Sequence, residues 1–373
     1  MEISLTVVLS LYFLLNLGLI YFWLRLKKTP AIQLPVEGSV LFSVVIPVRN
    51  EAQNMHNLLQ DLNAQTLPAA RFEVIVANDN STDDTRQIAL NFATNQARFD
   101  LKVIDMPEDF TVAPKKRAID QAIQMAQGEW ILTTDGDCRV GADWLRVFAQ
   151  NITPQVQLLS GPVTFVGFRS WAQTIEFSSL IGTGASAIGA GFPTMCNGAN
   201  LAYRKSAFLQ VAGFEGINTI ASGDDELLLH KIAGKFPDGI RFVKSALAVV
   251  QTAPQPNWRS FYNQRKRWAS KWDASKRWPT MLLAVFIFVA NASIVLAFAI
   301  WLRGAASHAF LCKMLFLKCG SEFIFLALIL RFLNKQKLIP LVVVVQFFYP
   351  FYVLFFGIVA QQKGFEWKGR QLK

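Results

Sequence analysis

Residues 130–137 read WILTTDGD, an apolar segment that ends on two carboxylates, Asp135 and Asp137. The apolar part, residues 130–134, predicts a buried strand, because a short apolar run bounded by turn residues is typical of a covered sheet. Two carboxylates at the carboxyl end of such a strand can face one hard cation and a diphosphate, since Mg²⁺ and Mn²⁺ prefer oxygen ligands. A solvated Asp-Gly turn is the plain structural alternative.

Apolar runs and helical stretches alternate on the amino-terminal side of this segment. Strands are predicted over residues 43–47, 72–78 and 101–104, and helices over 51–64, 82–94 and 115–126. This order predicts an α/β fold with a mostly parallel sheet and helices on both faces. Ligands of such sheets bind beyond the carboxyl ends of the strands, where Asp135 and Asp137 are expected to lie.

The two ends of the chain are strongly apolar. The chain is 52% hydrophobic and only 17% charged, whereas soluble domains carry about a quarter charged residues. Residues 5–24 are long enough to cross a membrane, and Arg25, Lys27 and Lys28 directly after them place the following domain in the cytoplasm. A signal peptide is disfavoured, because the basic residues follow the apolar run and no small-residue cleavage site is evident.

Residues 281–302, 310–333 and 338–360 are further candidate spans, of which the middle one contains Lys313, Lys318 and Glu322. With the amino terminus outside, four spans would put the basic tail outside, against the positive-inside rule. One segment, most readily 310–333, is therefore expected to lie in the interface or to re-enter. The predicted domains are an anchor (1–28), a cytoplasmic domain (29–278), two or three C-terminal spans (279–362) and a basic tail (363–373).

The formal net charge is +11, and the basic residues cluster beside the apolar segments. This placement favours the surface of the cytoplasmic membrane over nucleic acid as the partner of these basic residues. The four cysteines show neither a disulfide pattern nor metal-ligand spacing, as expected on the reducing side of a membrane. The three histidines lie far apart in sequence, so a zinc site is not predicted. No obligatory protein partner is inferred.

Two further strand ends carry polar residues, VIPVRNE (45–51) and ANDNSTDDT (77–85). Asp79 is well placed to bind a base or a ribose, as an acidic residue after a strand often does. Helix capping by Asn80, Ser81 or Asp83 is the alternative, and we expect it for Ser81 and Asp83 in any case.

Two motifs lie closer to the C-terminal spans. The segment SGDDE (222–226) either supplies a general base or favours a helix N-terminus with its acids. The segment QRKRW (264–268) either belongs to an aromatic and basic interfacial belt, with Trp258, Trp272 and Trp278, or places Arg267 near phosphates and Trp268 beside an acceptor.

In this order the four motifs, within residues 42–278, resemble glycosyltransferase family 2. The pattern is most similar to its membrane-bound branch, which includes the cellulose, hyaluronan and ceramide glycosyl-transferring enzymes. The resemblance implies a GT-A (Rossmann-like) domain with flanking transmembrane helices. It also implies inverting transfer from a nucleotide-sugar, with a uridine diphosphate donor expected, and Mg²⁺ or Mn²⁺ as cofactor.

The resemblance also implies roles for individual residues. Asp225 would be the catalytic base, with Asp224 as the alternative because the register is ambiguous by one residue; Lys231 then matches a basic residue of the family's following helix. Asp137 and Asp135 would hold the metal, and Pro114 stands where the family has a glycine before Lys115. The donor-binding residues would be Pro47, Arg49, Glu51, Asp79, Lys115, Asp135, Asp137, Gln264, Arg267 and Trp268. The acceptor-binding residues would be Asn197, Gly198, Asn200 and Trp268.

Transfer of one or a few sugars to a lipid-linked or membrane-embedded acceptor is the favoured function, because few spans leave little material for a wide polysaccharide channel. A processive polysaccharide synthase is one alternative, and a non-catalytic membrane scaffold that keeps the fold is another. A transporter is disfavoured, since the polar residues lie outside the spans. Residues 170–191 either guide an acceptor at the membrane surface or form an ordinary amphipathic core segment.

Overall fold

The computed structural model describes residues 1–28, 41–108, 112–168, 170–269, 278–359, 365–367 and 370–372. The chain forms two compact units. The helical unit comprises Met1–Arg25, Gly167–Ala187 and Gln255–Phe365, and the sheet unit comprises Leu26–Val166, Ile188–Pro254 and Glu366–Lys373. Each unit is described by itself below.

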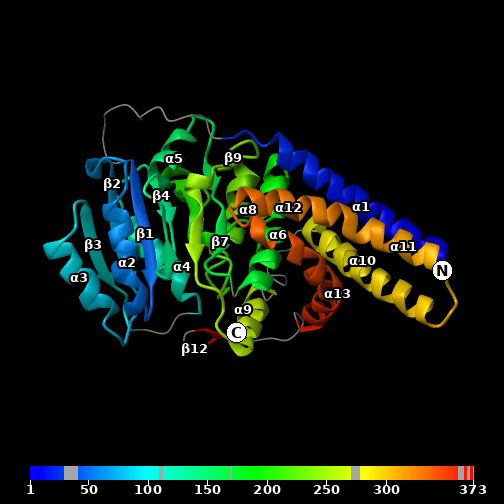
Figure 1. Ribbon diagram of the computed structural model, residues 1–373. Helices are drawn as coiled ribbons and strands as arrows, with labels where there is room; N and C mark the ends of the chain where they lie inside the picture. Colours follow the sequence, from blue (N-terminus) through cyan, green and yellow to red (C-terminus); the bar gives the residue numbers. More distant parts are fainter. Residues whose placement is uncertain are drawn as a thin grey trace. The chain divides into compact units, whose positions relative to one another are not determined.

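A seven-stranded sheet forms the centre of the sheet unit, with the strand order β3-β2-β1-β4-β8-β6-β9 (Figure 1). The strands β1, β2, β3 and β4 are parallel to one another, which confirms the predicted parallel sheet. β8 runs antiparallel to both β4 and β6, and β6 is parallel to β9. The bounds are β1 Phe42–Val48, β2 Phe72–Asn78, β3 Asp100–Asp105, β4 Trp130–Thr133, β6 Leu158–Ser160, β8 Leu201–Arg204 and β9 Ile240–Phe242.

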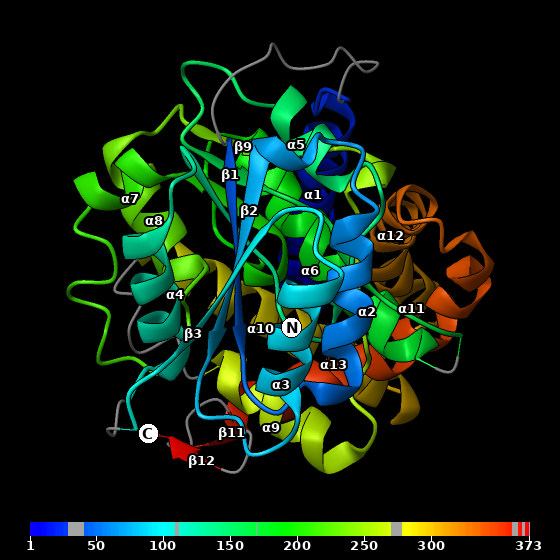
Figure 2. The ribbon, with the colours of Figure 1, turned by 90° about the vertical axis from the view of Figure 1, so that its left-hand side faces the viewer.

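Helices cover both faces of this sheet (Figure 2). The helices α2 (Ala52–Asn63) and α3 (Thr85–Asn95) contact each other on one face, and α4 (Pro114–Met125) packs against β1 and β2 on the other. Because both faces are covered, β1 and β2 consist of almost continuous apolar residues. The remaining helices of the unit are α5 (Trp144–Gln150), α7 (Lys205–Gln210), α8 (Glu226–Lys235) and the 3₁₀ turns η1 (Ala69–Arg71), η2 (Gly198–Asn200) and η3 (Ala246–Ala248).

A smaller three-stranded sheet has the order β5-β10-β7. It pairs β10 (Val250–Thr252) antiparallel to β5 (Cys138–Arg139) and parallel to β7 (Val163–Phe165). β5 follows the DGD turn directly, so this sheet brings a distant part of the chain beside the turn. A two-stranded sheet joins β11 (Phe365–Trp367) and β12 (Arg370–Leu372).

Three helices among the described residues are long and apolar enough to cross a membrane, at Glu2–Arg25, Thr280–Leu302 and Gln336–Val359. The first is α1, the second lies in α10 (Trp278–Leu302), and the third comprises the 3₁₀ turn η5 (Gln336–Leu341) and α13 (Val342–Val359). The predicted span over 310–333 corresponds to α11 (His308–Leu315) and α12 (Ser321–Phe332), which the π-helical turn η4 (Phe316–Gly320) joins into one unbroken helical segment.

Within the helical unit α1 contacts α10 and α12, and α10 also contacts α13 (Figure 1). A polar cluster lies inside it: Lys318 pairs with Glu322 at 2.6 Å, and Tyr12 and Gln346 also bond to Glu322. Charged groups inside such a helix bundle must find partners, because there is no water to solvate them. This cluster explains why Lys318 and Glu322, two of the charged residues in the 310–333 segment, are tolerated.

The helices α6 (Trp171–Gly189) and α9 (Trp258–Ala269) belong largely to the helical unit, although they lie within the predicted 29–278 domain. Ile175 of α6 packs in an apolar cluster with Leu330 and Val342. Residues 170–191 therefore contribute to a core, as one of the two interpretations expected, and their acceptor-guiding role stays a prediction. The domain boundaries at residues 28, 278 and 362 also stay predictions, and residues 29–40 and 270–277 lie outside the described part of the chain.

Candidate active site

The loops that follow β1 and β2 are tied together at the carboxyl edge of the sheet. Arg49 donates to the carbonyl oxygens of Asp79 at 2.7 Å and Asn80 at 2.8 Å. Asn50 donates its backbone N–H to Ser81 Oγ at 3.0 Å and accepts from the N–H of residue 82 at 2.8 Å. Both asparagines have positive φ, 54° at Asn50 and 53° at Asn80, which asparagine tolerates better than most residues. Arg49 thus fixes the loop that carries Asp79.

Two further predicted donor-binding residues lie beside the connection between the loops after β1 and β2. Pro47 is half-buried in β1 and pairs with Ala77 of β2. Glu51 donates its N–H to Thr85 Oγ1 at 2.7 Å, and its carboxylate accepts from Asn54 at 2.8 Å. Both residues therefore lie at the predicted edge of the sheet.

Asp79 is 3% exposed and lies directly after β2, with its carboxylate 3.6 Å from Arg117. The N-cap residue of α3 is Asp84, which makes no side-chain capping bond, in place of the predicted Asp83; the carboxylate of Asp83 accepts the N–H of Thr85, the first residue of α3, at 3.1 Å. Ser81 accepts from the other loop instead of from α3. Partial burial disfavours the charge of Asp83, but its hydrogen bonds outweigh this and lower its pKa.

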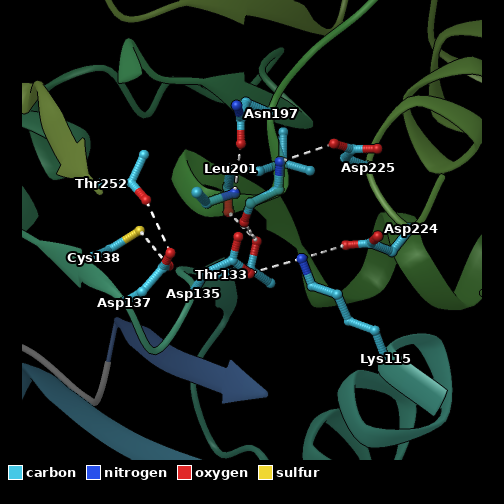
Figure 3. A network of polar contacts seen from close by, with 12 residues as sticks. Lys115, Thr133, Asp135, Asp137, Cys138, Asn197, Leu201, Asp224, Asp225 and Thr252 are labelled. Carbon is cyan, nitrogen blue, oxygen red and sulfur yellow. Dashed lines mark hydrogen bonds and ion pairs between the residues drawn. The ribbon is translucent and has the colours of Figure 1, made fainter. Parts of the chain in front are cut away.

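Lys115, in the first turn of α4, connects two carboxylates (Figure 3). Its ammonium lies 2.7 Å from Asp135 and 3.1 Å from Asp224. Burial disfavours the charge of Lys115, but the attraction of Asp135, Asp224 and Asp225 outweighs burial and raises its pKa. The side chain is therefore a fixed cation between the end of β4 and the start of α8.

Asp137, the second carboxylate of the DGD turn, faces the small sheet. It accepts from Thr252 Oγ1 of β10 at 3.1 Å, and Cys138 Sγ lies 3.8 Å from its other oxygen. Gly136 is required between the two acids, because a Cβ there would lie 2.9 Å from side-chain atoms of Glu51 and Val48. The turn is packed against β1 and its acids hold defined partners, which speaks against a solvated Asp-Gly turn.

The donor set of this turn fits Mg²⁺ or Mn²⁺. The described residues contain no cluster of three or more Asp, Glu, His or Cys side chains that could hold a metal alone. Two carboxylates that leave the remaining positions to substrate phosphates are nevertheless a common way to bind Mg²⁺. The ammonium of Lys115 against Asp135 already shows that this carboxylate accepts a cation.

Asp224 and Asp225 have different partners, although they are neighbours in sequence. Asp225 caps α8: one of its oxygens accepts the N–H of Glu226 at 2.7 Å and the other accepts the N–H of Gly198 at 3.1 Å. The capping interpretation of these acids is thus confirmed for Asp225. Asp224 turns instead to Lys115 (Figure 3). The pair therefore combines one helix cap with one carboxylate in the central ion-pair network.

The predicted acceptor loop lies against the same network. The side chain of Asn197 accepts the N–H of Ala199 at 2.9 Å and so caps the turn η2. The carbonyl of Gly198 accepts from Thr133 Oγ1 of β4 at 2.7 Å. Gly198 is thus bonded on one side to the DGD strand and on the other to Asp225.

Asn200 has a scaffolding position. It is completely buried, and its amide donates to the carbonyls of Pro162 at 2.7 Å and Ala248 at 2.8 Å. Its side-chain oxygen accepts from Trp144 Nε1 at 2.9 Å. With these bonds Asn200 holds the η2 turn in place, and the geometry speaks against the predicted direct contact with an acceptor.

Two family models match the chain: Glycosyl transferase family 2 over residues 43–211, and Glycosyl transferase family group 2 over residues 130–359. The second match covers more than half of the 373 residues. The chain belongs to glycosyltransferase family 2. The resemblance predicted from the four motifs is therefore confirmed.

Relatives of this family 2 protein include the glycosyltransferase AglE of Haloferax volcanii, which is 32% identical over 124 residues, 33% of this chain and 39% of AglE. The poly-beta-1,6-N-acetyl-D-glucosamine synthase of Staphylococcus aureus is 25% identical over 278 residues, 70% of this chain and 62% of that synthase. The matches thus span less than two thirds of these relatives. The mannosyltransferase PcManGT of Pyrobaculum calidifontis, solved with GDP-Man and Mn²⁺, is a structural neighbour with 18% sequence identity and a TM-score of 0.56. The superposition covers 94% of this chain and 99% of that chain, and the likeness shows the GT-A fold.

The predicted site residues Gln264, Arg267 and Trp268 of this family 2 protein lie on α9, which belongs to the helical unit. Gln264 accepts from Arg265 Nη1 at 2.6 Å, and the ring of Trp268 lies 5.8 Å from that of Phe177. The roles of Gln264, Trp268 and Arg267 stay predictions from the family resemblance.

The sequence did not single out Arg265, which is 4% exposed and pairs with Glu176 of α6. One signal could have found this pair: Glu176 is the only acidic residue within the apolar segment 170–191, and a lone acid in an apolar helix indicates a buried partner. Thr252 was also missed, and it lies too far along the chain from Asp137 for any local pattern to connect them.

Proposed function

We propose that this family 2 protein is an inverting glycosyltransferase that moves a sugar from a nucleotide-diphosphate donor to a hydroxyl of a lipid-linked or membrane-embedded acceptor. One observation carries the proposal. Lys115 bonds at once to Asp135, on the donor-side turn, and to Asp224, beside the predicted acceptor loop. Residues expected to serve the two substrates therefore meet at one ammonium group at the carboxyl edge of the sheet, where ligands of such sheets bind.

On the donor side, Asp135 and Asp137 would hold Mg²⁺ or Mn²⁺ and Asp79 would contact the base of the nucleotide. When bound, the cation supplies positive charge that stabilises the departing diphosphate. Lys115 adds a charge fixed in place by the protein, which stabilises developing negative charge without reorganisation. The metal in the complex of the mannosyltransferase supports this assignment by analogy of fold.

On the acceptor side, the geometry favours Asp224 over Asp225 as the base, contrary to the preference from sequence. Both oxygens of Asp225 already accept backbone N–H groups, which hold it as a cap. Asp224 lies in the network without being the cap. In the proposed reaction Asp224 takes the hydroxyl proton, the acceptor oxygen bonds to the anomeric carbon, and the bond from that carbon to the diphosphate oxygen breaks. One displacement on the opposite face inverts the configuration, so no covalent intermediate is needed.

The proposed location is the cytoplasmic membrane, with the sheet unit in the cytoplasm. Arg25 ends α1 and Lys27 and Lys28 follow it, as the positive-inside rule requires. The three candidate spans among the described residues would put the amino terminus and the basic tail on opposite sides, in agreement with the positive-inside rule. An acceptor that itself resides in the membrane fits an enzyme anchored in this way.

The name of the staphylococcal relative, a poly-N-acetylglucosamine synthase matched over 70% of this chain, favours a second candidate function, processive polymer synthesis. The length of the product distinguishes the two. Short glycolipid products from a labelled nucleotide-sugar support the proposal, and long polymer would overturn it in favour of the synthase.

The decisive experiment is a donor screen on purified protein with Mg²⁺ or Mn²⁺, with released nucleotide as the signal. Asp137→Asn and Asp224→Asn should each reduce release by about 10²-fold or more, because each removes a charge that acts in the transition state. Asp238→Asn, an exposed site after α8, is the matched control. Wild-type activity in both site variants would contradict the assignment, and no release with any donor would favour a non-catalytic scaffold.

A further inference from the structure

A buried charged cluster lies in the helical unit, outside the carboxylate site. Arg265 of α9 forms an ion pair with Glu176 of α6. The phenol oxygen of Tyr352 on α13 accepts from Arg265 Nε at 2.9 Å, and its O–H donates to Glu176 at 3.0 Å. The side chain of Arg265 is 4% exposed, so its position is fixed from two neighbouring helices.

The remaining contacts of Arg265 are with residues of its own helix. Its guanidinium carbon lies 4.3 Å from the ring centroid of Trp268 and 4.4 Å from that of Phe261, both within the range of a cation–π contact. Its Nη1 donates to Gln264 at 2.6 Å. In the QRKRW motif (264–268) the family resemblance gives roles to Gln264, Arg267 and Trp268; two of these, Gln264 and Trp268, are therefore held directly by Arg265, to which it gives none.

Stability alone is a poor reason for such a pair. Two buried charges lose their hydration, and apolar residues of similar size in place of a buried ion pair are often neutral or stabilising. Arg265 can instead orient its neighbours, because its planar guanidinium group bonds to Glu176 and Tyr352 while its faces contact aromatic rings. Lysine has no such plane, so it could not serve all these contacts together.

We propose that Arg265 is a positioning residue, which Glu176 and Tyr352 fix in place and which in turn fixes the indole of Trp268 and the amide of Gln264 for sugar transfer. The inference rests on the proposed function, since the motif matters only if sugar is transferred. Its role differs from that of a substrate contact, because Arg265 is buried among protein groups.

The test removes the cluster as a unit, in the variant Arg265→Met, Glu176→Met, Tyr352→Phe. No charge is left unpaired, so the protein should remain folded with a Tm close to that of the wild type. Turnover should fall on the order of tenfold to a hundredfold, the range expected when a substrate-contacting group is misplaced by about 1 Å. Arg265→Lys keeps the charge without the fork and should show a loss in the same direction. Arg259→Met, an exposed arginine of the same helix, is the matched control.

A second readout does not require activity. The near-ultraviolet circular dichroism difference between wild type and Trp268→Phe isolates the signal of this indole, and the cluster variant should lose that signal. Wild-type turnover in the cluster variant or in Arg265→Lys, or an unchanged Trp268 signal in the cluster variant, would overturn the inference. If the wild type transfers no sugar, the proposed function fails, and the Trp268 signal still decides whether Arg265 orients the indole.

Discussion

Replacing Gly198 by alanine places a methyl group inside the contact between Lys115 and Asp224. The new Cβ would lie 2.9 Å from Asp224 Oδ2 and 3.4 Å from Lys115 Nζ. A carbon atom does not approach an oxygen so closely, so the carboxylate of Asp224 must move. Gly198 is not among the glycines with positive φ, so alanine brings no backbone strain at this position. The perturbation is therefore confined to the site.

The expected magnitude follows from the ion pair. At an effective dielectric constant of about 20, a lengthening of about 0.4 Å from 3.1 Å removes about 0.6 kcal/mol of the attraction between Lys115 and Asp224. Asp224, held less firmly, is then misplaced relative to the acceptor hydroxyl, which should cost about 1–2 kcal/mol in the transition state. This cost corresponds to a decrease of about tenfold in kcat.

The assay is nucleotide release by Gly198→Ala under saturating donor, together with its thermal unfolding midpoint. Gly141→Ala is the matched control, because a Cβ there would lie 3.6 Å from the carbonyl oxygen of Leu247, an ordinary van der Waals contact. Turnover equal to that of the control would refute the claim that the Lys115–Asp224 contact matters for transfer. A fall in Tm that matched the fall in turnover would refute the claim that the change is local.

Three further predictions concern stability. Burial disfavours the charge of Glu73, but hydrogen bonds from Lys102, Ser43 and the backbone of Gln127 outweigh burial and lower the pKa of Glu73 from 4.5. The ionised carboxylate therefore stabilises the fold above about pH 4.5, and this stabilisation is lost as the pH falls through the folded pKa. Thermal unfolding between pH 3 and 7 should show this loss in the wild type and a flatter profile in Glu73→Gln, and equal profiles would contradict it. Asn200→Ala leaves the carbonyls of Pro162 and Ala248 and the indole N–H of Trp144 without this partner. The free energy of unfolding, measured by denaturant titration, should therefore fall by about 2–4 kcal/mol, and a change below about 1 kcal/mol would refute the scaffolding role. Gly182→Ala places a Cβ 2.6 Å from Ile329 and should destabilise the helical unit by about 1–3 kcal/mol, which a lowered Tm in detergent would reveal and an unchanged one would exclude.

The sequence predicted the parallel half of the sheet well and the other half poorly. The strands β1 to β4 are separated by helices, so their pattern indicates the strands and their parallel pairing, whereas their order across the sheet, β3-β2-β1-β4, follows only from the structure. The strands β5 to β10 have two to four residues each, too few to show any period. Their pairing depends on contacts such as β10 with β5, between segments more than a hundred residues apart.

The candidate site divides in a similar way. The sequence indicated that Asp135 and Asp137 follow a strand and that Asp224 and Asp225 precede a helix, and the structure shows both, because strand ends and helix starts are visible in sequence. Which acid caps the helix and which meets Lys115 depends on side-chain direction, which sequence order does not contain. For the same reason Asn200 resembled an acceptor contact, although its side chain points into the scaffold.

The charge balance of the network gives a physical reason for the proposed metal dependence. The ammonium of Lys115 contacts the carboxylates of Asp135 and Asp224, and Asp137 and Asp225 belong to the same network (Figure 3), so acidic side chains outnumber the lysine among these residues. A nucleotide diphosphate would add further negative charge beside Asp135 and Asp137. Its approach to a partly buried, acidic edge is repulsive unless a cation accompanies it. A divalent ion bound between these two carboxylates and the diphosphate would turn that repulsion into attraction, while Lys115 keeps Asp224 in place on the acceptor side.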